Sequence, residues 1–315
     1  MKKYIIIAFI GFAGKLSAQQ MSLNSQYLFN EILVNPAAVG TKEYVPVQLN
    51  FRKQWNSFPG APVTQSISCH SSVFKQMGIG GSIFNDVAGP SRRTGFNFSS
   101  AYHLRLDNSK NQMLGVGFGL SMTQHLIDVS KLTTYLSDDP AVTRGFNNQL
   151  VPDANVGAFY RYKNKLSVGL SAYNLVQSKR DLYHFEDALR NTMKRMYYLY
   201  ASYNFDINES FNIKTTTLVQ AIETGTTQFD VTAIGTFRKM IWLGTSYRHT
   251  DAVAILAGCQ IKGFRLGYSY DITLSDIGKY SNGSHEVFIE LQLFKNNNQS
   301  KNPWLKRNRI YSPGR

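Results

Sequence analysis

The chain has 315 residues, of which 43% are hydrophobic, 13% aromatic and 17% charged, and its formal net charge is +14. A mean hydropathy of −0.25 is too polar for a bundle of membrane-spanning helices, but it allows a β-barrel, whose polar lumen offsets its apolar outer face. Lys and Arg fall mostly at strand ends, in connections and in the tail rather than on one module, which argues against a nucleic-acid partner and favours anionic lipid or an acidic protein.

The N-terminal segment has the features of a secretory signal. Lys2 and Lys3 precede an apolar run from Tyr4 to Ala13 that is too short to span a bilayer, and Leu16-Ser17-Ala18 offers a small-residue cleavage site. We therefore predict a signal peptide over 1–18. No Cys lies near the cleavage site to carry a lipid anchor, and no later apolar run reaches the ~18 residues of a transmembrane helix.

Residues 19–44 are predicted to be a periplasmic segment before the barrel. They are too apolar for a free linker, so we expect them to pack against the barrel or inside it as a plug. Asn35-Pro36 would end any helix begun there. The apolar residues of the segment are Tyr27, Leu28, Phe29, Ile32, Leu33 and Val34.

From residue 45 onward the dominant period is two. In 47–55, Val47, Leu49, Phe51 and Trp55 alternate with polar residues, which is typical of a strand with one apolar face. Several runs reach the ~9–11 residues that a tilted strand needs to cross a bilayer. The pattern predicts an all-β fold, a transmembrane antiparallel outer-membrane β-barrel of about 14 strands over 45–294. The expected strands are 45–55, 63–74, 77–86, 94–106, 113–127, 154–162, 166–174, 195–205, 211–221, 227–237, 240–249, 252–261, 264–271 and 284–294.

The lengths of the predicted connections alternate along the chain. Every second connection is short, and most of the connections between these are long, with only 222–226 and 250–251 brief. Short turns at one rim and long loops at the other are typical of outer-membrane barrels, whose short turns are periplasmic. This parity predicts an outer-membrane protein with both termini in the periplasm. The short set is 75–76, 107–112, 163–165, 206–210, 238–239 and 262–263, and the long loops are 56–62, 87–93, 128–153, 175–194 and 272–283.

The final predicted strand ends on Phe294, and an aromatic end suits insertion by the outer-membrane assembly machinery. The residues beyond it, 295–315, form a basic tail that includes Lys306 and Arg307. Two interpretations of this tail remain open, a solvated extension or a periplasmic docking segment.

Several stretches resemble the PorP/SprF family of the type IX secretion and gliding systems of Bacteroidota. The resemblance implies an outer-membrane barrel that supports secretion or surface anchoring of adhesins, alongside a periplasmic ring and motor complex. It covers most of the predicted mature chain. The stretches are 25–30 (SQYLFN), 35–38 (NPAA) with Gly40, Gln54-Trp55, Phe58, 60–64 (GAPVT), 77–81 (MGIGG), Asp86, Gly89-Pro90, 115–125 and 283–286 (GSHE).

Candidate partner-binding residues come from these stretches and from the predicted loops. In 176–193, apolar residues at helical spacing suggest a short amphipathic helix across the barrel mouth, and we expect this loop and 128–153 to face the partner. The candidates are Tyr27, Phe29, Asn35, Pro36, Trp55, Phe58, Pro59, Arg92, Arg93, Leu182, Phe185 and Leu189.

No constellation indicates catalysis, a cofactor or a metal. His103 and His125 could both face the lumen, where hydrogen bonding is a better interpretation than a metal site. The glycines of 115–119 lie inside a strand, so they suit a plug or bulky neighbour rather than a phosphate. Asp138-Asp139-Pro140 suits a turn better than a calcium loop. Cys69 and Cys259 should face lipid on strands that are not neighbours, so no disulfide is expected.

The sequence thus predicts a non-enzymatic outer-membrane barrel of type IX secretion and gliding machinery. Its expected partners are a secreted adhesin-like surface protein, periplasmic ring or motor components, and outer-membrane lipid. The alternative is a small-solute channel of the porin or fatty-acid-transporter kind. Conductance distinguishes the two, because a plugged barrel should be nearly silent.

Overall fold

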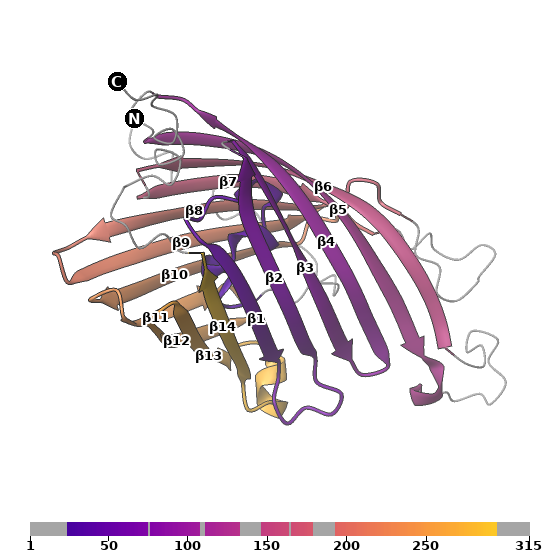
Figure 1. Ribbon diagram of the computed structural model, residues 1–315. Coiled ribbons are helices and arrows are strands. Elements are labelled where there is room, and N and C mark those ends of the chain that lie inside the picture. Colours follow the sequence, from indigo (N-terminus) through magenta and orange to yellow (C-terminus); the bar gives the residue numbers. More distant parts are fainter. Residues whose placement is uncertain are drawn as a thin grey trace, which may run out of the picture.

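The computed structural model describes residues 24–74, 76–107, 111–132, 146–163, 165–178 and 193–294. They form a closed antiparallel barrel of fourteen strands in chain order, in which β1 and β14 pair to close the ring (Figure 1). The predicted fold class and strand number are therefore confirmed. The strands are β1 (Val45–Lys53), β2 (Val63–Phe74), β3 (Met77–Ala88), β4 (Ser91–Arg105), β5 (Gln112–Asp128), β6 (Phe146–Tyr162), β7 (Leu166–Tyr173), β8 (Met196–Asp206), β9 (Phe211–Ile222), β10 (Thr227–Phe237), β11 (Ile241–Arg248), β12 (Ala252–Ile261), β13 (Phe264–Thr273) and β14 (Ser284–Leu293).

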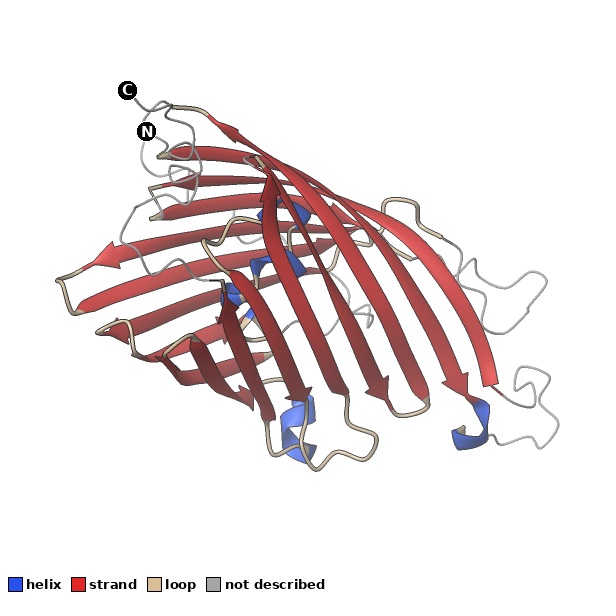
Figure 2. Cartoon of the chain, viewed as in Figure 1, coloured by secondary structure: helices blue, strands red, loops and turns tan. Residues whose placement is uncertain are grey.

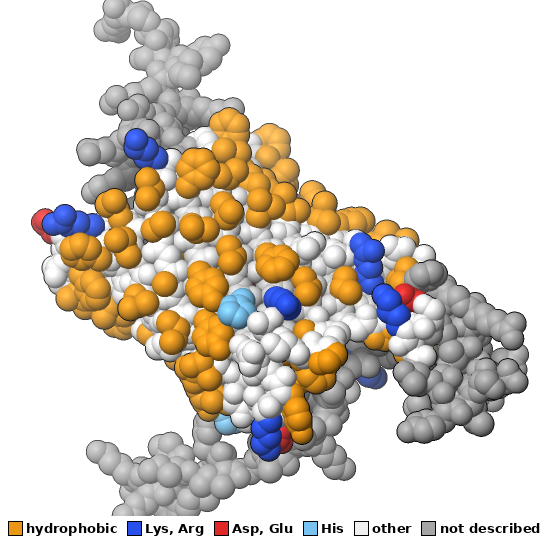
Figure 3. Space-filling model, turned by 90° about the horizontal axis from the view of Figure 1, so that it is seen from below, with side chains coloured by type: hydrophobic (Ala, Val, Ile, Leu, Met, Phe, Trp, Pro, Cys, Tyr) orange, Lys and Arg blue, Asp and Glu red, His pale blue; other side chains and the backbone are white. Residues whose placement is uncertain are grey.

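Alternation along each strand separates an apolar outer face from a polar lumen. On β1, Leu49 and Phe51 are 48% and 45% exposed, whereas Asn50 between them is 6% exposed. Hydrophobic side chains cover much of the outer face seen in Figure 3. Within the described ranges, no helix has the length and apolarity needed to cross a membrane. The period of two in the sequence thus translates directly into an inside and an outside.

Two predicted connections are wrong. The first loop, 128–153, is shorter because β6 begins at Phe146 and pairs with β5 as far as Asp128. The second, 87–93, is reduced to Gly89-Pro90 between β3 and β4. In both cases the strands continue, because β5 and β6 pair as far as Asp128 and Phe146, and β3 and β4 pair as far as Ala88 and Ser91. Pro152 lies within β6 although it cannot donate a ladder hydrogen bond.

The connections sort into two rims. The short-turn rim joins β2 to β3, β4 to β5, β6 to β7, β8 to β9, β10 to β11 and β12 to β13, and its longest connection is 106–111. The long-loop rim, at the lower end of Figure 1, carries 54–62 and 274–283 among its described segments, with the 3-10 helices η5 (Val129–Lys131) and η6 (Asp276–Tyr280). The longer connections therefore all lie at one rim, as the sequence predicts.

The barrel wall is taller on one side of the long-loop rim. Strands β5 and β6 have 17 residues each, whereas β7 has 8. The registers align Gln65, Asn85, Thr94 and Gln124 in one row across β2–β5, on the same outer face as Phe96. This row interrupts the apolar outer face, and the tips of β4–β6 extend past it.

Three short 3-10 helices lie inside the ring of strands (Figure 2): η2 (Tyr27–Phe29), η3 (Glu31–Leu33) and η4 (Pro36–Ala38). Tyr27, Leu28 and Val34 are at most 2% exposed, and each fully buried apolar side chain contributes about 1.5–3 kcal/mol. The described part of the N-terminal segment, 24–44, is called the inner segment below. The wall residues of the shared core are Ala101, Phe159, Met196, Tyr198, Tyr200, Leu218, Ile234, Trp242, Ala254, Leu256 and Phe288.

Candidate functional site

Glycines on the wall make room for the inner segment. A Cβ on Gly117 would lie 2.4 Å from the backbone nitrogen of Ala37, and one on Gly157 would lie 2.2 Å from Oδ1 of Asn35. Neither distance is compatible with a side chain. The interpretation that the inward glycines of 115–119 accommodate a plug or bulky neighbour is confirmed at Gly117, because η4 lies directly against β5 and β6.

Asn35 fixes the turn into η4 and ties it to the wall. Its Oδ1 accepts a hydrogen bond from the backbone N–H of Ala37 at 2.9 Å, which caps η4. Its Nδ2 donates to the backbone oxygens of Ala158 at 2.9 Å and Leu170 at 3.2 Å. One side-chain amide thus makes hydrogen bonds to the inner segment and to two strands, which explains why an Asn occupies this position.

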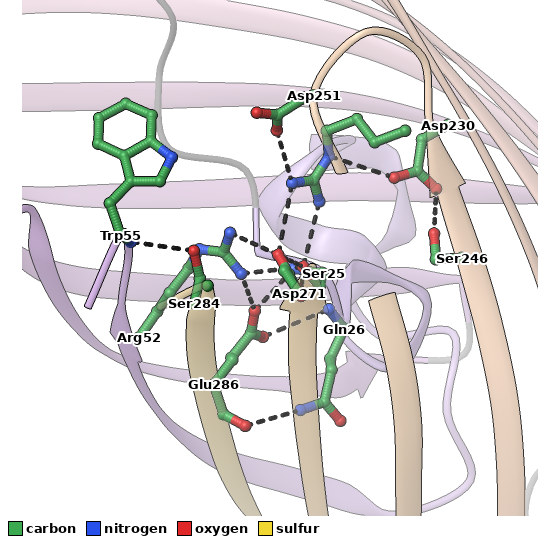
Figure 4. Close-up of polar contacts among 12 residues, drawn as sticks. Ser25, Gln26, Arg52, Trp55, Asp230, Ser246, Asp251, Asp271, Ser284 and Glu286 are labelled. Atoms are coloured by element: carbon green, nitrogen blue, oxygen red, sulfur yellow. Dashed lines mark hydrogen bonds and ion pairs between the residues drawn. The ribbon is translucent and has the colours of Figure 1, made fainter. Parts of the chain in front are cut away.

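The start of the inner segment is held by a buried cluster of charges, called the Arg52 cluster (Figure 4). Arg52 contacts Asp271 at 2.7 Å and Glu286 at 3.0 Å. The hydroxyl of Ser25 donates to Asp271 at 2.7 Å, and its backbone N–H donates to Glu286 at 2.7 Å. The remaining members, Arg248, Asp230 and Asp251, join through ion pairs of Arg248 with Asp230 at 3.4 Å, Asp251 at 3.1 Å and Asp271 at 3.6 Å.

Tyr27 extends this cluster along the segment. Its hydroxyl donates to Oδ1 of Asp230 at 2.9 Å, and the same oxygen accepts from Ser246 at 2.9 Å. Burying charges is costly unless each is paired and hydrogen bonded. Every charge of the cluster has an ion-pair partner, although Oδ2 of Asp230 and the Nε atoms of Arg52 and Arg248 accept or donate no hydrogen bond. The cluster thereby positions Ser25 and Tyr27 in the lumen.

A second cluster, called the Glu31 cluster, lies nearer the short-turn rim. Glu31 contacts Arg161 at 3.5 Å and Lys214 at 3.7 Å, and its Oε1 accepts from the Tyr200 hydroxyl at 2.9 Å. Its other members are Lys42, Glu290 and Arg265, since Glu290 pairs with Lys42 at 3.0 Å and with Arg265 at 3.0 Å. The cluster holds the middle and the end of the inner segment.

The pKa of Glu31, which lies on the inner segment outside the spanning strands, is lowered from 4.5 to about 2. Burial alone would raise this pKa, but the charges of Lys214, Arg161 and Lys42 together lower it by more than burial raises it. A depressed carboxylate pKa stabilises the bound segment fully above pH 4.5, and that contribution is lost as the pH falls toward about 2.

We therefore expect the inner segment to stay bound from neutral pH to about pH 5 and to loosen between about pH 4 and pH 2, as the pKa of Glu31 dictates. Channel recordings across this range measure the fraction of open barrels, which should rise about tenfold per pKa unit of lost stabilisation. Glu31→Gln should flatten the dependence. An equally steep rise in that variant would assign the effect to other carboxyl groups.

Four of the predicted partner residues lie in the lumen and contact the wall. Tyr27, Asn35 and Pro36 are buried, and Phe29 packs against Trp242 and Phe288 with ring centroids 5.2 and 5.1 Å apart. These residues position the inner segment in the barrel.

The other described candidates lie at the long-loop rim. The alternation of side chains along β4 places Arg92 and Arg93 on opposite faces of the wall. Arg92 points outward and donates to Asn85 at 2.8 Å, whereas Arg93 points inward and pairs with Asp86. Phe58 and Pro59 are exposed at the tip of 54–62.

Hydrogen bonds connect the loops of this rim into one surface. Trp55 donates its backbone N–H to Ser284 at 3.0 Å, and Asn56 donates its own to Gly283. Gly89 donates to Gly60 at 2.9 Å, which ties 54–62 to the β3–β4 turn. The rim therefore presents Phe58 and the 73%-exposed Tyr280 from a fixed frame.

Several predictions fall outside the described residues. These are the signal peptide 1–18, Asp138 to Pro140, the tail 295–315, and the helix containing Leu182, Phe185 and Leu189.

The lumenal histidines and the cysteines are placed as the sequence suggested. His103 and His125 both point inward, but the β4–β5 register sets them opposite Gly115 and Arg93, far apart along the barrel. In the parts of the chain that the structure describes, no group of three or more His, Cys, Asp or Glu could hold a metal ion. Cys69 on β2 and Cys259 on β12 are free thiols on strands that are not neighbours.

A cavity of about 130 Å³, lined by both polar and apolar side chains, remains between the inner segment and the long-loop rim. Asp86, Arg93, Asn97, Asn155 and Tyr198 are among its lining residues. The lumen is thus filled by the inner segment at its centre and hollow toward one mouth.

The two charge clusters were missed by the sequence analysis. A usable signal existed, because a charged side chain at an inward position of a spanning strand is costly and has to find a partner or a cavity. Arg52, Asp271 and Glu286 occupy such positions, but alternation alone does not reveal which strands bring them together.

Comparison with known proteins identifies the family. The family described as "Type IX secretion system membrane protein PorP/SprF" matches residues 16–291. No curated protein matches the chain. Among solved structures, the toluene transporter TbuX of Ralstonia pickettii is 9% identical with a TM-score of 0.51, covering 83% of this chain and 93% of that one. A FadL homologue of Pseudomonas aeruginosa is 9% identical with a TM-score of 0.45, covering 82% and 91%.

At such low identity the likeness to TbuX shows the fold alone, which is that of an outer-membrane barrel. The family match extends over nearly all of the described residues and confirms the resemblance carried by the SQYLFN and NPAA stretches. The chain belongs to the PorP/SprF family of type IX secretion system membrane proteins.

Proposed function

We propose that the protein supports secretion or cell-surface anchoring of an adhesin-like protein, as an outer-membrane component of type IX secretion and gliding machinery. It acts by protein–protein binding and without catalysis. In this proposal residues 1–18 are removed on export, the long-loop rim faces outward, and both termini lie in the periplasm, where ring or motor components dock. The parity of connection lengths supports this orientation.

The occupied lumen is the observation that carries the proposal. The inner segment crosses the centre of the barrel and is anchored by both charge clusters and by the wall contacts of Asn35. A barrel filled in this way suits a binding platform better than a conduit for solutes. Its fixed long-loop rim, with Phe58 and Tyr280 exposed, offers the apolar groups that protein interfaces favour.

Cross-linking and pull-down from outer membranes test the role. We expect a large secreted adhesin or a periplasmic ring component to co-purify with the tagged protein. Replacing Trp55 and Phe58 by Ala should lower recovery of the surface protein about tenfold, since aromatic anchors can carry 2 kcal/mol or more of binding energy.

Ile207→Ala is the matched control, because Ile207 is 58% exposed at the opposite rim. Its recovery of the surface protein should equal that of the unaltered chain. Equal recovery by the rim variant and the unaltered chain would refute the rim as the binding surface. Deletion of 176–193 with unchanged adhesin display would count against that loop.

The alternative function is a small-solute channel, which the cavity at the long-loop mouth favours. It requires that the inner segment move aside in ordinary conditions. A channel would conduct steadily in planar bilayers, whereas the proposed binding platform would be nearly silent.

A further inference from the structure

The interior of the short-turn mouth carries more cations than carboxylates. In the Glu31 cluster, Lys42, Arg161, Lys214 and Arg265 share only Glu31 and Glu290. Arg161 and Lys214 lie within 4 Å of Glu31, and Lys42 and Arg265 lie within 4 Å of Glu290, so each carboxylate is shared by two cations. The described part of this cluster therefore has two unmatched positive charges.

These cations keep part of their side-chain surface exposed. The side chains of Lys42 and Arg161 are each 17% exposed, that of Arg265 is 18% and that of Lys214 is 21%. Partly desolvated charges interact more strongly than charges in bulk water, because the surrounding protein screens them less. An anionic group entering the mouth would therefore meet an attractive field.

The opposite end of the lumen has the reverse balance. Among the described interior residues near the long-loop rim, Arg52, Arg93 and Arg248 face a larger number of carboxylates, namely Asp86, Asp153, Asp230, Asp251, Asp271 and Glu286. The lumen is thus positive toward the short turns and negative toward the long loops. An anionic chain is attracted at the first mouth and repelled at the second.

The arrangement of cations at the short-turn mouth favours a polypeptide as the ligand. Its cations come from three strands and the inner segment, so they suit several charges along a chain better than one phosphate. Arg265 lies over the Phe29 ring at 5.3 Å and Lys42 over the Tyr44 ring at 5.7 Å, which places aromatic surface beside the charges. A lipid is a poor fit, because its acyl chains would have to stay outside the wall while these side chains face the lumen.

We propose that the short-turn mouth is a docking site for an acidic polypeptide segment of a partner protein. The acidic side chains would pair with Arg161, Lys214 and Arg265 and neutralise the surplus charge of the Glu31 cluster. This rests on the proposed function and deepens it, because it gives the chemistry of a partner that docks at the periplasmic, short-turn end.

Fluorescence anisotropy with the full-length protein in detergent tests the site. The probe is a fluorescein-labelled peptide of alternating Glu and Ser, and its matched control has Lys in place of Glu. We expect the Glu peptide to bind at least about tenfold more tightly and to weaken at 1 M salt, where the Debye length falls to about 3 Å. Equal binding of both peptides, or complete displacement by equimolar inorganic phosphate, would overturn the proposal.

Charge variants locate the site by the direction of their effects. Arg161→Gln and Arg265→Gln should each weaken binding of the Glu peptide several-fold. Arg92→Gln removes a cation from the outer face of the other rim and should leave binding of the Glu peptide unchanged. Similar losses in Arg161→Gln and Arg92→Gln would refute the location.

The same variants separate this proposal from the proposed function. Channel recordings of each variant at neutral pH are the control, because a silent barrel indicates that the inner segment remains in place. Loss of peptide binding in Arg161→Gln with full recovery of the surface protein supports a separate site at the short-turn mouth. Peptide binding that depends on Trp55 and Phe58 instead would place the acidic segment at the long-loop rim and overturn it.

Discussion

Replacing Gly117 by Ala is expected to convert a nearly silent barrel into one that conducts. The new methyl group would lie 2.4 Å from the nitrogen of Ala37 and 2.6 Å from the carbonyl carbon of Pro36, so the backbone of η4 has to move away. Overpacking of this kind costs about 1–3 kcal/mol, which would raise the open population roughly 5- to 150-fold. Planar-bilayer recordings of the purified variant measure that population directly.

Gly119→Ala is the matched control, with the same substitution on the same strand and face. Its methyl group would meet Oγ of Ser99 at 3.1 Å and Nδ2 of Asn155 at 3.4 Å, which are side-chain ends that can shift. This variant should stay silent, and gel mobility with and without heating should show both barrels folded. A silent Gly117→Ala variant, or steady current from the unaltered chain, would contradict the occupied lumen and favour the solute channel.

Arg52→Met is expected to produce the largest loss of stability. It would leave Asp271 and Glu286 buried without the guanidinium that pairs with them at 2.7 and 3.0 Å. Breaking a buried ion pair from one side costs about 3–5 kcal/mol, because an uncompensated charge remains. Denaturant unfolding in detergent, followed by tryptophan fluorescence, measures the change in the free energy of unfolding.

Two comparisons isolate the cause. Lys165 pairs with Asp206 at 2.9 Å where both side chains are largely exposed, so Lys165→Met should leave stability unchanged. Adding Glu286→Gln to Arg52→Met removes one stranded carboxylate and should recover part of the loss. A double variant that is no more stable than Arg52→Met would show that packing of the arginine stem, rather than its charge, matters.

Much of the fold could be read from the sequence because each spanning strand must satisfy two environments at once. The alternation of Leu114, Val116, Phe118 and Leu120 with small or polar residues gives β5 both its extent and its inner face. Outside the apolar band this constraint disappears. The segment 146–153 accordingly resembled a loop, although it forms the outer part of β6.

The charge clusters could not be predicted, because they depend on register and closure. Arg52 and Asp271 are 219 positions apart, and alternation states only that both point inward. Their contact requires β13, β14 and β1 to lie side by side at matching heights, which the sequence does not specify. The Asn35-Pro36 pair signalled a helix end, but its hydrogen bonds to β6 and β7 depend on the same three-dimensional arrangement.

The contacts between the first described residues and the last two strands have a consequence for folding of the barrel. Ser25 binds Asp271 and Glu286, which follow it by 246 and 261 positions and emerge near the end of synthesis. Contacts so distant along the chain form slowly, because a long loop must close before they give any stabilisation. An intermediate holding only β2–β12 would leave Ser25 and Arg52 without their carboxylates. The contacts of Ser25 with the wall are therefore completed only when β13 and β14 join the barrel.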